Sequence, residues 1–107
     1  MPNAHKLVIV SAPDKNIAES LAQQLVSEQL AACVNILPAI TSVYRWNNLI
    51  EKDSEVLLLI KTTTNVIDKL QKKVVELHPY DLPEFICLNI EQGSSDYLDW
   101  ISQCTKQ

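Results

Sequence analysis

The sequence contains a single glycine among its 107 residues, no long apolar run and no cluster of basic residues. A glycine-rich phosphate-binding loop is excluded, because such loops need several glycines. No stretch approaches the roughly 20 apolar residues of a membrane-spanning helix. The net charge of −4, with dispersed Lys and Arg, argues against a face that binds nucleic acid. Residues 1–6 lack the basic start and apolar stretch of a signal peptide, so we expect a cytoplasmic protein with neither membrane nor nucleic acid as a partner.

Cysteine is also scarce, and its spacing is informative. The three cysteines, Cys33, Cys87 and Cys104, are odd in number, widely spaced and without a Cys-x-x-Cys pair. This pattern fits neither a disulfide framework nor a structural zinc site. Cys33 and Cys87 lie in apolar, strand-like contexts, where a cysteine most often packs as a small buried hydrophobic residue. We therefore expect reduced thiols.

Hydrophobic residues, by contrast, make up 47% of the chain, which predicts one rigid domain over residues 1–107. A short apolar strand at 7–10 precedes a helix that Asp14 caps and that continues to about residue 29, with apolar residues at helical spacing. Residues 32–46 then follow a strand pattern. Pro38 interrupts this strand, which requires a bulge or an edge position because proline cannot donate a ladder hydrogen bond.

The next two residues, Asn47 and Asn48, predict a tight hairpin turn, since asparagine tolerates positive φ. Residues 49–62 would return antiparallel to 33–46. Fourteen extended residues span about 45 Å at ~3.3 Å per residue, whereas a compact chain of this size is roughly 34 Å across. The hairpin must therefore project from the domain as a ribbon. We expect other copies of the chain to cover its apolar tip, which comprises Tyr44, Trp46, Leu49 and Ile50.

The second half of the chain repeats the pattern of strand and helix. Thr64 is expected to cap a second helix, residues 85–90 form a strand, and Ser94 or Ser95 opens a last helix. The order βαββαβα predicts an α+β fold, a ferredoxin-like βαββαβ sandwich with an extended central hairpin and an extra C-terminal helix. Both main helices should lie on one face of a four-stranded antiparallel sheet.

Residues 78–84, which we call the proline corner, join the second helix to the last strand. Pro79 forces His78 out of the helical region, so the helix should end at or just before His78. Pro83 prevents an early return to helix. The segment is therefore a stiff connection that presents an imidazole, a phenol and two carboxylates from a fixed place. It is either a binding site or a structural element of an assembly.

Stretches along nearly the whole chain resemble the CutA family of divalent-cation tolerance proteins. The matching residues are Leu30-Ala31-Ala32-Cys33-Val34-Asn35-Ile36 with Pro38, Ser42-x-Tyr44-x-Trp46, Glu55 through Ile60-Lys61-Thr62, His78-Pro79-Tyr80-x-x-Pro83-Glu84, Ile90, Gly93 and Tyr97-Leu98-x-Trp100. The resemblance implies a ferredoxin-like fold, a tight homotrimer and an association with tolerance of copper and other divalent metals. The homotrimer agrees with the projecting ribbon.

The chain departs from the family pattern at two places. Asn48 stands where similar members have a glycine in the hairpin, which keeps positive φ accessible at some cost in strain. Val10 and Leu77 stand where some members carry a cysteine and a second histidine. His78 and Cys33 are therefore the remaining soft or borderline metal ligands at family positions.

His78 is the leading candidate for a metal ligand, because imidazole suits copper and zinc. The alternative is a histidine that ends a helix and bonds a carbonyl. Cys33 could bind Cu⁺ through its thiolate or pack in the core. Asp81 and Glu84 are weaker candidates, which would either complete the site across a subunit boundary or solvate the proline corner.

Two further groups of side chains have functional and structural interpretations. Glu51, Asp53 and Glu55 alternate along one strand and so share a face, which could present carboxylates to hard cations or simply form a solvated edge. Aromatic residues could line a ligand cleft between subunits or pack in the trimer interface and core. They are Tyr44, Trp46, Tyr80, Tyr97 and Trp100.

No catalytic constellation is present in the sequence, which has neither a nucleophile with an identifiable base nor a His-Glu-x-x-His motif. We therefore expect a non-enzymatic trimer that binds copper, as Cu²⁺ or Cu⁺, or similar metal ions and supports metal tolerance. The alternative is a trimeric sensor or adaptor for a small ligand, with clefts between subunits near His78, Tyr80 and Trp46 that signal to an unidentified protein partner.

Overall fold

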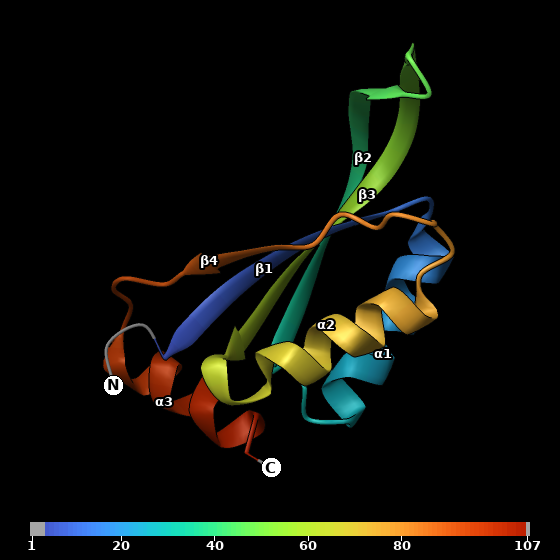
Figure 1. The fold of residues 1–107 in the computed structure, drawn as a ribbon. Helices are drawn as coiled ribbons and strands as arrows, with labels where there is room; N and C mark the ends of the chain where they lie inside the picture. Colours follow the sequence, from blue (N-terminus) through green and yellow to red (C-terminus); the bar gives the residue numbers. More distant parts are fainter. Residues whose placement is uncertain (1–3, 107) are drawn as a thin grey trace.

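The computed structural model describes residues 4–106, which form four strands, three α-helices and one 3-10 turn. In chain order these elements are β1 (His5–Ala12), α1 (Lys15–Ser27), β2 (Cys33–Trp46), β3 (Leu49–Thr63), the 3-10 turn (Thr64–Val66), α2 (Ile67–Leu77), β4 (Ile86–Asn89) and α3 (Ser95–Cys104). The predicted order βαββαβα is confirmed. Figure 1 shows α1 and α2 side by side beneath the sheet, with the β2–β3 ribbon rising beyond it.

The four strands form one sheet in the order β2-β3-β1-β4, and each pair of neighbouring strands is antiparallel. β1 and β3 are the central strands, so each βαβ unit crosses over one strand, as the ferredoxin-like architecture requires. The predicted fold class is therefore correct. β2 and β4 are the edge strands, and β4 pairs with β1 over only four residues.

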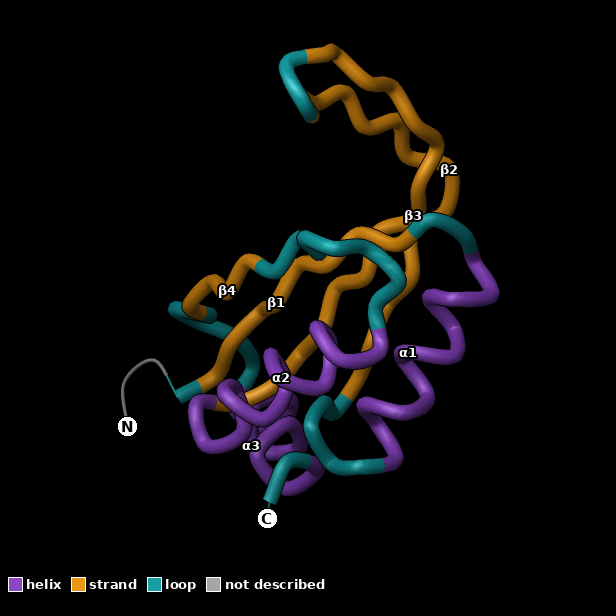
Figure 2. Tube along the Cα trace, turned by 45° about the vertical axis from the view of Figure 1, so that its right-hand side comes forward, coloured by secondary structure: helices purple, strands orange, loops and turns teal. Residues whose placement is uncertain are grey.

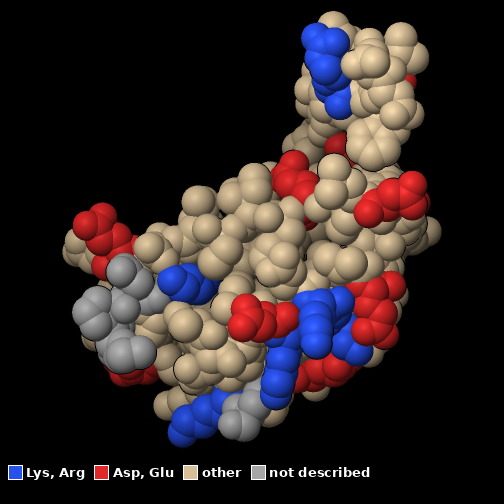
Figure 3. All heavy atoms as spheres, in the orientation of Figure 1, with Lys and Arg blue, Asp and Glu red and all other residues tan. Residues whose placement is uncertain are grey.

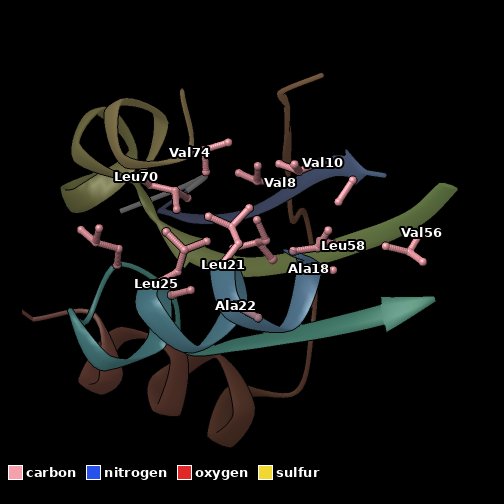
Figure 4. Packing of buried hydrophobic residues seen from close by; sticks show 14 of the residues in the cluster. Val8, Val10, Ala18, Leu21, Ala22, Leu25, Val56, Leu58, Leu70 and Val74 are labelled. Carbon is pink, nitrogen blue, oxygen red and sulfur yellow. The ribbon is translucent and has the colours of Figure 1, made fainter. Parts of the chain in front are cut away.

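The hydrophobic core lies between the sheet and the helices α1 and α2 (Figure 4). Apolar residues alternate along the strands and recur at helical spacing, because side chains of a strand point to opposite faces in turn. The fully buried members include Val8 and Val10 of β1, Leu58 and Ile60 of β3, Leu25 of α1, and Leu70 and Val74 of α2. This layer fixes the positions of β1 and β3, on which the candidate site is built.

Local signals at the helix ends account for most of the helix boundaries. The Asp14 side chain accepts a hydrogen bond from the Ile17 N–H at 2.8 Å and caps α1, as predicted. α1 ends at Ser27, and Gln29 adopts a left-handed φ of 61°. His78 is extended, with φ −78° and ψ 138°, so Pro79 ends α2 as expected.

The predicted cap at Thr64 is wrong. Thr64 enters a 3-10 turn, and α2 begins only at Ile67 with no side-chain cap. The Thr64 N–H instead donates to the Ala4 carbonyl at 2.8 Å, which ties the end of β3 to the start of the described chain. A long-range backbone bond thus replaces the local cap that the sequence favours.

The ribbon formed by β2 and β3 follows the predicted register closely. Trp46 pairs with Leu49, and Asn47 and Asn48 form the turn with φ values of 51° and 65°. A bulge interrupts the pairing between Leu37 and Ile40, beside Pro38. The longest dimension of the chain is 44 Å against 25 and 22 Å for the other two, and Figure 2 shows the ribbon bending away from the domain. The ribbon projects, as predicted from its length.

The second face of the sheet, opposite α1 and α2, is only partly covered. α3 lies at one end of this face, where Ser102 bonds His5 at 2.8 Å and Thr105 bonds Thr63 at 2.9 Å. The remainder carries partly exposed apolar residues, since they alternate with the core-facing ones. They are Leu7, Ile9, Leu37, Leu57, Leu59, Ile86 and Leu88. We call this group the apolar second face.

Three boundaries or environments differ from the sequence prediction. β1 is longer than residues 7–10, because it pairs along its whole length with β3. β4 is shorter than residues 85–90 and covers only Ile86–Asn89. Cys87 is exposed rather than buried, because it lies on β4, an edge strand of the sheet.

Candidate functional site

A groove of about 610 Å³ lies between the ribbon and the proline corner. This volume is typical of a small-ligand site. Its lining comes from the end of β1, from both ribbon strands and from the proline corner. The residues are Ser11, Ser42, Val43, Tyr44, Arg45, Trp46, Glu55, Tyr80, Asp81, Leu82 and Glu84.

His78 lies behind this groove and holds the proline corner against the sheet. Its side chain is buried, and its Nε2 donates to the carbonyl oxygen of Ser11 at 2.7 Å. Its Nδ1 accepts a hydrogen bond from the Tyr80 N–H at 3.1 Å. A carbonyl can only accept and an amide N–H can only donate, so these partners fix the tautomer with the proton on Nε2. Both ring nitrogens are therefore engaged within the chain.

Tyr80 connects the proline corner to the base of the ribbon. Its ring contacts the His78 ring in a tilted arrangement, with ring centroids 4.7 Å apart and an interplanar angle of 56°, and its hydroxyl donates to Glu55 Oε2 at 2.7 Å. Burial, and next the hydrogen bond to Glu55, raise the pKa of the Tyr80 phenol well above its usual value. Glu55 itself is only 8% exposed, so Tyr80 supplies a partner that this carboxylate needs.

A second phenol and carboxylate pair lies further along the ribbon. The Tyr44 hydroxyl donates to Asp53 Oδ2, and this bond is the main cause that raises the pKa of Tyr44 to about 12. Tyr44 and Trp46 are each about two-fifths exposed, at 41% and 43%. The groove therefore has aromatic rings on the ribbon side that are only partly covered by the rest of the described chain.

Asp81 and Glu84 complete the acidic side of the groove, and both are exposed. Figure 3 shows acidic groups where the ribbon leaves the domain, while most basic groups in that view lie lower, toward the helices. Arg45 is the one basic residue in the lining. The groove thus has more carboxylates than cations.

Cys33, Tyr97 and Trp100 lie away from the groove. Cys33 pairs with Lys61 at the end of the sheet that α3 covers, and Lys61 Nζ lies 3.8 Å from its Sγ. Burial, with a contribution from Cys33, raises the pKa of Tyr97. The rings of Tyr97 and Trp100 on α3 contact each other in a tilted arrangement, with ring centroids 5.5 Å apart. These three residues form a separate packing cluster, so the structure brings together only some of the residues that the sequence singled out.

The groove residues do not form a ready metal centre or a catalytic triad in the single chain. Between residues 4 and 106, no three His, Cys, Asp or Glu side chains converge as metal ligands. His78 cannot act as a base for Ser11 or Ser42 in this arrangement, because both of its nitrogens already have partners. The arrangement suits binding through hydrogen bonds, charge and aromatic contact.

The sequence did not single out the role of Glu55 in this site. Alternation along β3 placed Glu55 with Asp53 and Glu51 as an acidic edge, but gave no reason for its burial. Burial results from the proline corner, whose Tyr80 lies over Glu55 although 25 residues separate them in sequence. Ser11 was missed for a similar reason, since its partner His78 is 67 residues away.

Within the described part of the chain, no helix is both long and apolar enough to span a bilayer. The sequence model of the family described as "CutA1 divalent ion tolerance protein" matches residues 6–104. A Thermus thermophilus protein named "Divalent-cation tolerance protein CutA" is 46% identical over 100 residues, which are 94% of this chain and 97% of the relative. The human "Protein CutA" is 42% identical over 106 residues, which are 99% of this chain and 59% of the human protein. The chain therefore spans about three-fifths of the human relative.

Solved structures agree with these matches. The structure of the Thermus thermophilus divalent cation tolerance protein superposes with a TM-score of 0.93 at 45% identity, and covers 95% of this chain and 99% of its own. The crystal structure of CutA1 from Oryza sativa gives a TM-score of 0.94 at 42% identity, and covers 97% of this chain and 95% of its own. With a family match over residues 6–104 and relatives of this identity, the chain belongs to the CutA family of divalent-cation tolerance proteins.

Proposed function

We propose that the chain acts as a non-enzymatic homotrimer in divalent-cation tolerance, and that the groove below the ribbon is its ligand site. The observation that carries this proposal is the position of the groove, which is built half from the domain and half from a ribbon that the single chain leaves uncovered. A ligand in this place would contact both the domain and the surface through which subunits associate. Binding can then influence assembly or partner recognition without a chemical step.

Two exposed apolar surfaces support association. On the ribbon, Val43, Leu49 and Ile50 are 66%, 63% and 71% exposed. On the apolar second face, Ile86 and Leu88 are each nearly half exposed. Exposed apolar patches of this kind mark interaction sites, and a two-stranded ribbon is marginally stable by itself. Copies of the same chain would cover both surfaces at once.

Direct copper coordination by His78 and Cys33 has less support. The two residues lie at different ends of the sheet, and His78 would have to give up two hydrogen bonds to bind a metal ion. A metal ion would have better access to the exposed carboxylates of Asp81 and Glu84 in the groove than to the buried imidazole of His78. A shared site with a neighbouring subunit would supply the further ligands that one chain lacks.

The cytoplasm remains the proposed location. Names of relatives give no single compartment, since the Oryza sativa and Arabidopsis thaliana proteins are called chloroplastic and an Archaeoglobus fulgidus structure is described as periplasmic. The proposal of cation tolerance does not depend on the compartment.

Isothermal titration calorimetry of the purified protein with Cu²⁺, Zn²⁺ and a set of small metabolites tests the ligand site. We expect saturable binding that Asp81→Asn combined with Glu84→Gln weakens, and that Cys33→Ala leaves unchanged. Binding that is lost in Cys33→Ala and unaffected by the groove variants would contradict the proposal and favour a copper site. Absence of turnover with common phosphate and ester substrates is expected for every variant.

A further inference from the structure

The direction of the hydrogen bonds in the groove restricts what it can bind. Tyr80 donates its hydroxyl proton to Glu55, and Tyr44 donates its proton to Asp53. A phenol has one proton to donate, so what each oxygen still offers to a ligand is its lone pairs. Both phenols thus face the groove as acceptors. A phenol keeps its proton at neutral pH, and the pKa of both phenols is raised further above that range.

Glu55 adds an acceptor of a different kind. Among residues 4–106, its one hydrogen-bond partner is Tyr80, which engages Oε2. No fully buried polar side-chain atom in this part of the chain lacks a partner, so Oε1 must remain accessible. Glu55 lines the groove and is only 8% exposed, so we infer that the accessible oxygen faces the groove. A carboxylate buried to this extent is stabilised by a cation or a further donor.

The other residues that line the groove also favour a ligand that carries positive charge and donates hydrogen bonds. Asp81 and Glu84 bring two more carboxylates, and the rings of Tyr44, Trp46 and Tyr80 offer faces that attract cations. Arg45 also lines the groove, but the three carboxylates of Glu55, Asp81 and Glu84 outnumber this single cation. The groove therefore combines acceptors, negative charge and aromatic rings.

We propose that the groove binds a small organic ammonium ion, whose nitrogen donates hydrogen bonds to Glu55 Oε1 and the Tyr80 oxygen while its apolar part contacts the aromatic rings. This inference rests on the proposed function, in which the groove is the ligand site. An ammonium ion fits better than a bare metal ion, because it needs few converging oxygens and gains from aromatic faces. The ammonium ion also supplies hydrogen-bond donors, which the two phenols do not offer because each already donates its only proton to a carboxylate.

Three probes of nearly equal shape test the charge preference on the full chain: benzylammonium, benzyl alcohol and benzoate. Calorimetry is expected to show saturable binding of benzylammonium, with benzyl alcohol about tenfold weaker or more, and no binding of benzoate. Amide shifts in NMR spectra should map to the ribbon base and the proline corner. Shifts confined to α3 would overturn the assignment of the site.

Matched variants then test the role of Glu55. Glu55→Gln keeps the shape and one acceptor but removes the charge, so the Kd for benzylammonium should rise about tenfold or more. Glu76→Gln, at an exposed position on α2 outside the groove, should leave the Kd unchanged. If Glu55→Gln does not fold, Glu84→Gln provides the same test at an exposed position, with a smaller rise in Kd expected.

The outcomes separate this inference from the proposed function. Binding of benzoate but not of benzylammonium, mapped to the groove, would overturn the ammonium inference and leave the groove as a ligand site. Binding of Cu²⁺ or Zn²⁺ in the groove without benzylammonium binding would do the same. No saturable binding in the groove by any of these probes would overturn both.

Discussion

Strand β3 runs through two very different environments, and the contrast between them explains much of the molecule. In its second half, Leu58 and Ile60 are completely buried between the sheet and the helices. In its first half, Leu49 and Ile50 are 63% and 71% exposed on the ribbon. The residue types are the same, but α1 and α2 cover only the part of the sheet within the domain (Figures 1 and 4).

This difference separates the free energy of folding from that of association. Residues under the helices bury apolar area within one chain, and so stabilise the domain itself. Residues on the ribbon can bury theirs only against another chain. The groove lies at the junction, where Glu55 is buried and Tyr44 is exposed. Variants on either side of the junction should therefore change different observables.

The largest expected effect comes from a matched pair of leucine truncations in β3. Leu58→Ala should lower the free energy of unfolding by ~2–5 kcal/mol, because it leaves a cavity in a closed core. Leu49→Ala should leave the folded domain intact and weaken association instead. Urea denaturation and light scattering over a dilution series measure the two effects. Equal loss of unfolding free energy in both variants, with no change in mass, would contradict the division between domain and ribbon.

The bond between the proline corner and the ribbon base should give the next largest effect. Tyr80→Phe removes the donor to the buried Glu55 and should cost ~1–3 kcal/mol of unfolding free energy. Tyr97→Phe is a matched control on α3, where the neighbouring group is the weakly accepting thiol of Cys33. Its expected cost is smaller. A larger loss in the control than in Tyr80→Phe would show that Glu55 does not depend on this bond.

Alkaline pH should weaken the same junction. The pKa of Tyr44 is raised to about 12 and that of Tyr80 is also raised, whereas an unfolded phenol has a pKa of 10.0. The folded chain therefore holds these protons more tightly. Their contribution to stability is complete below pH ~10 and is lost as pH rises through the folded pKa values.

Urea midpoints measured on both sides of pH ~10 test this dependence, and phenolate absorbance follows the titration. The midpoint should fall less steeply with pH in the double variant Tyr44→Phe/Tyr80→Phe. An equally steep fall in the double variant would assign the alkaline loss to other groups.

The smallest expected effects concern left-handed backbone positions, which this glycine-poor chain fills with other residues. Gln29, after α1, has a φ of 61° and Asn48, in the ribbon turn, has a φ of 65°. Gln29→Gly should raise the unfolding free energy by ~0.5–1 kcal/mol, since glycine adopts this region without strain. Asn48→Gly should gain less, because asparagine already tolerates positive φ. A loss of stability in Gln29→Gly would show that the strain at this position is negligible.

Much of the fold follows from local rules that the sequence displays. The Asp14 cap, the end of α2 before Pro79, the turn at Asn47 and Asn48, and the bulge beside Pro38 each depend on a few neighbouring residues. These features, with the order of the elements, were enough to predict the ferredoxin-like topology and the projecting ribbon.

The candidate site was predicted only in part, because it depends on contacts between distant segments. Tyr44, Trp46, Tyr80, Asp81 and Glu84 do line one groove. Periodicity gave no indication that Glu55 would be buried or that both nitrogens of His78 would find partners. Periodicity also did not reveal the apolar second face. The apolar residues of this face alternate with core residues, so the strands have the continuous apolar pattern that is typical of strands buried on both faces.

Light scattering coupled to size-exclusion chromatography tests most directly the claim that the ribbon is an association surface. At micromolar concentration, we predict a mass three times that of the 12.1 kDa chain for the unmodified protein. Ile50→Glu, which places a charge at an exposed ribbon position, should lower this mass without loss of circular dichroism. The mass of a single chain for the unmodified protein would contradict the account.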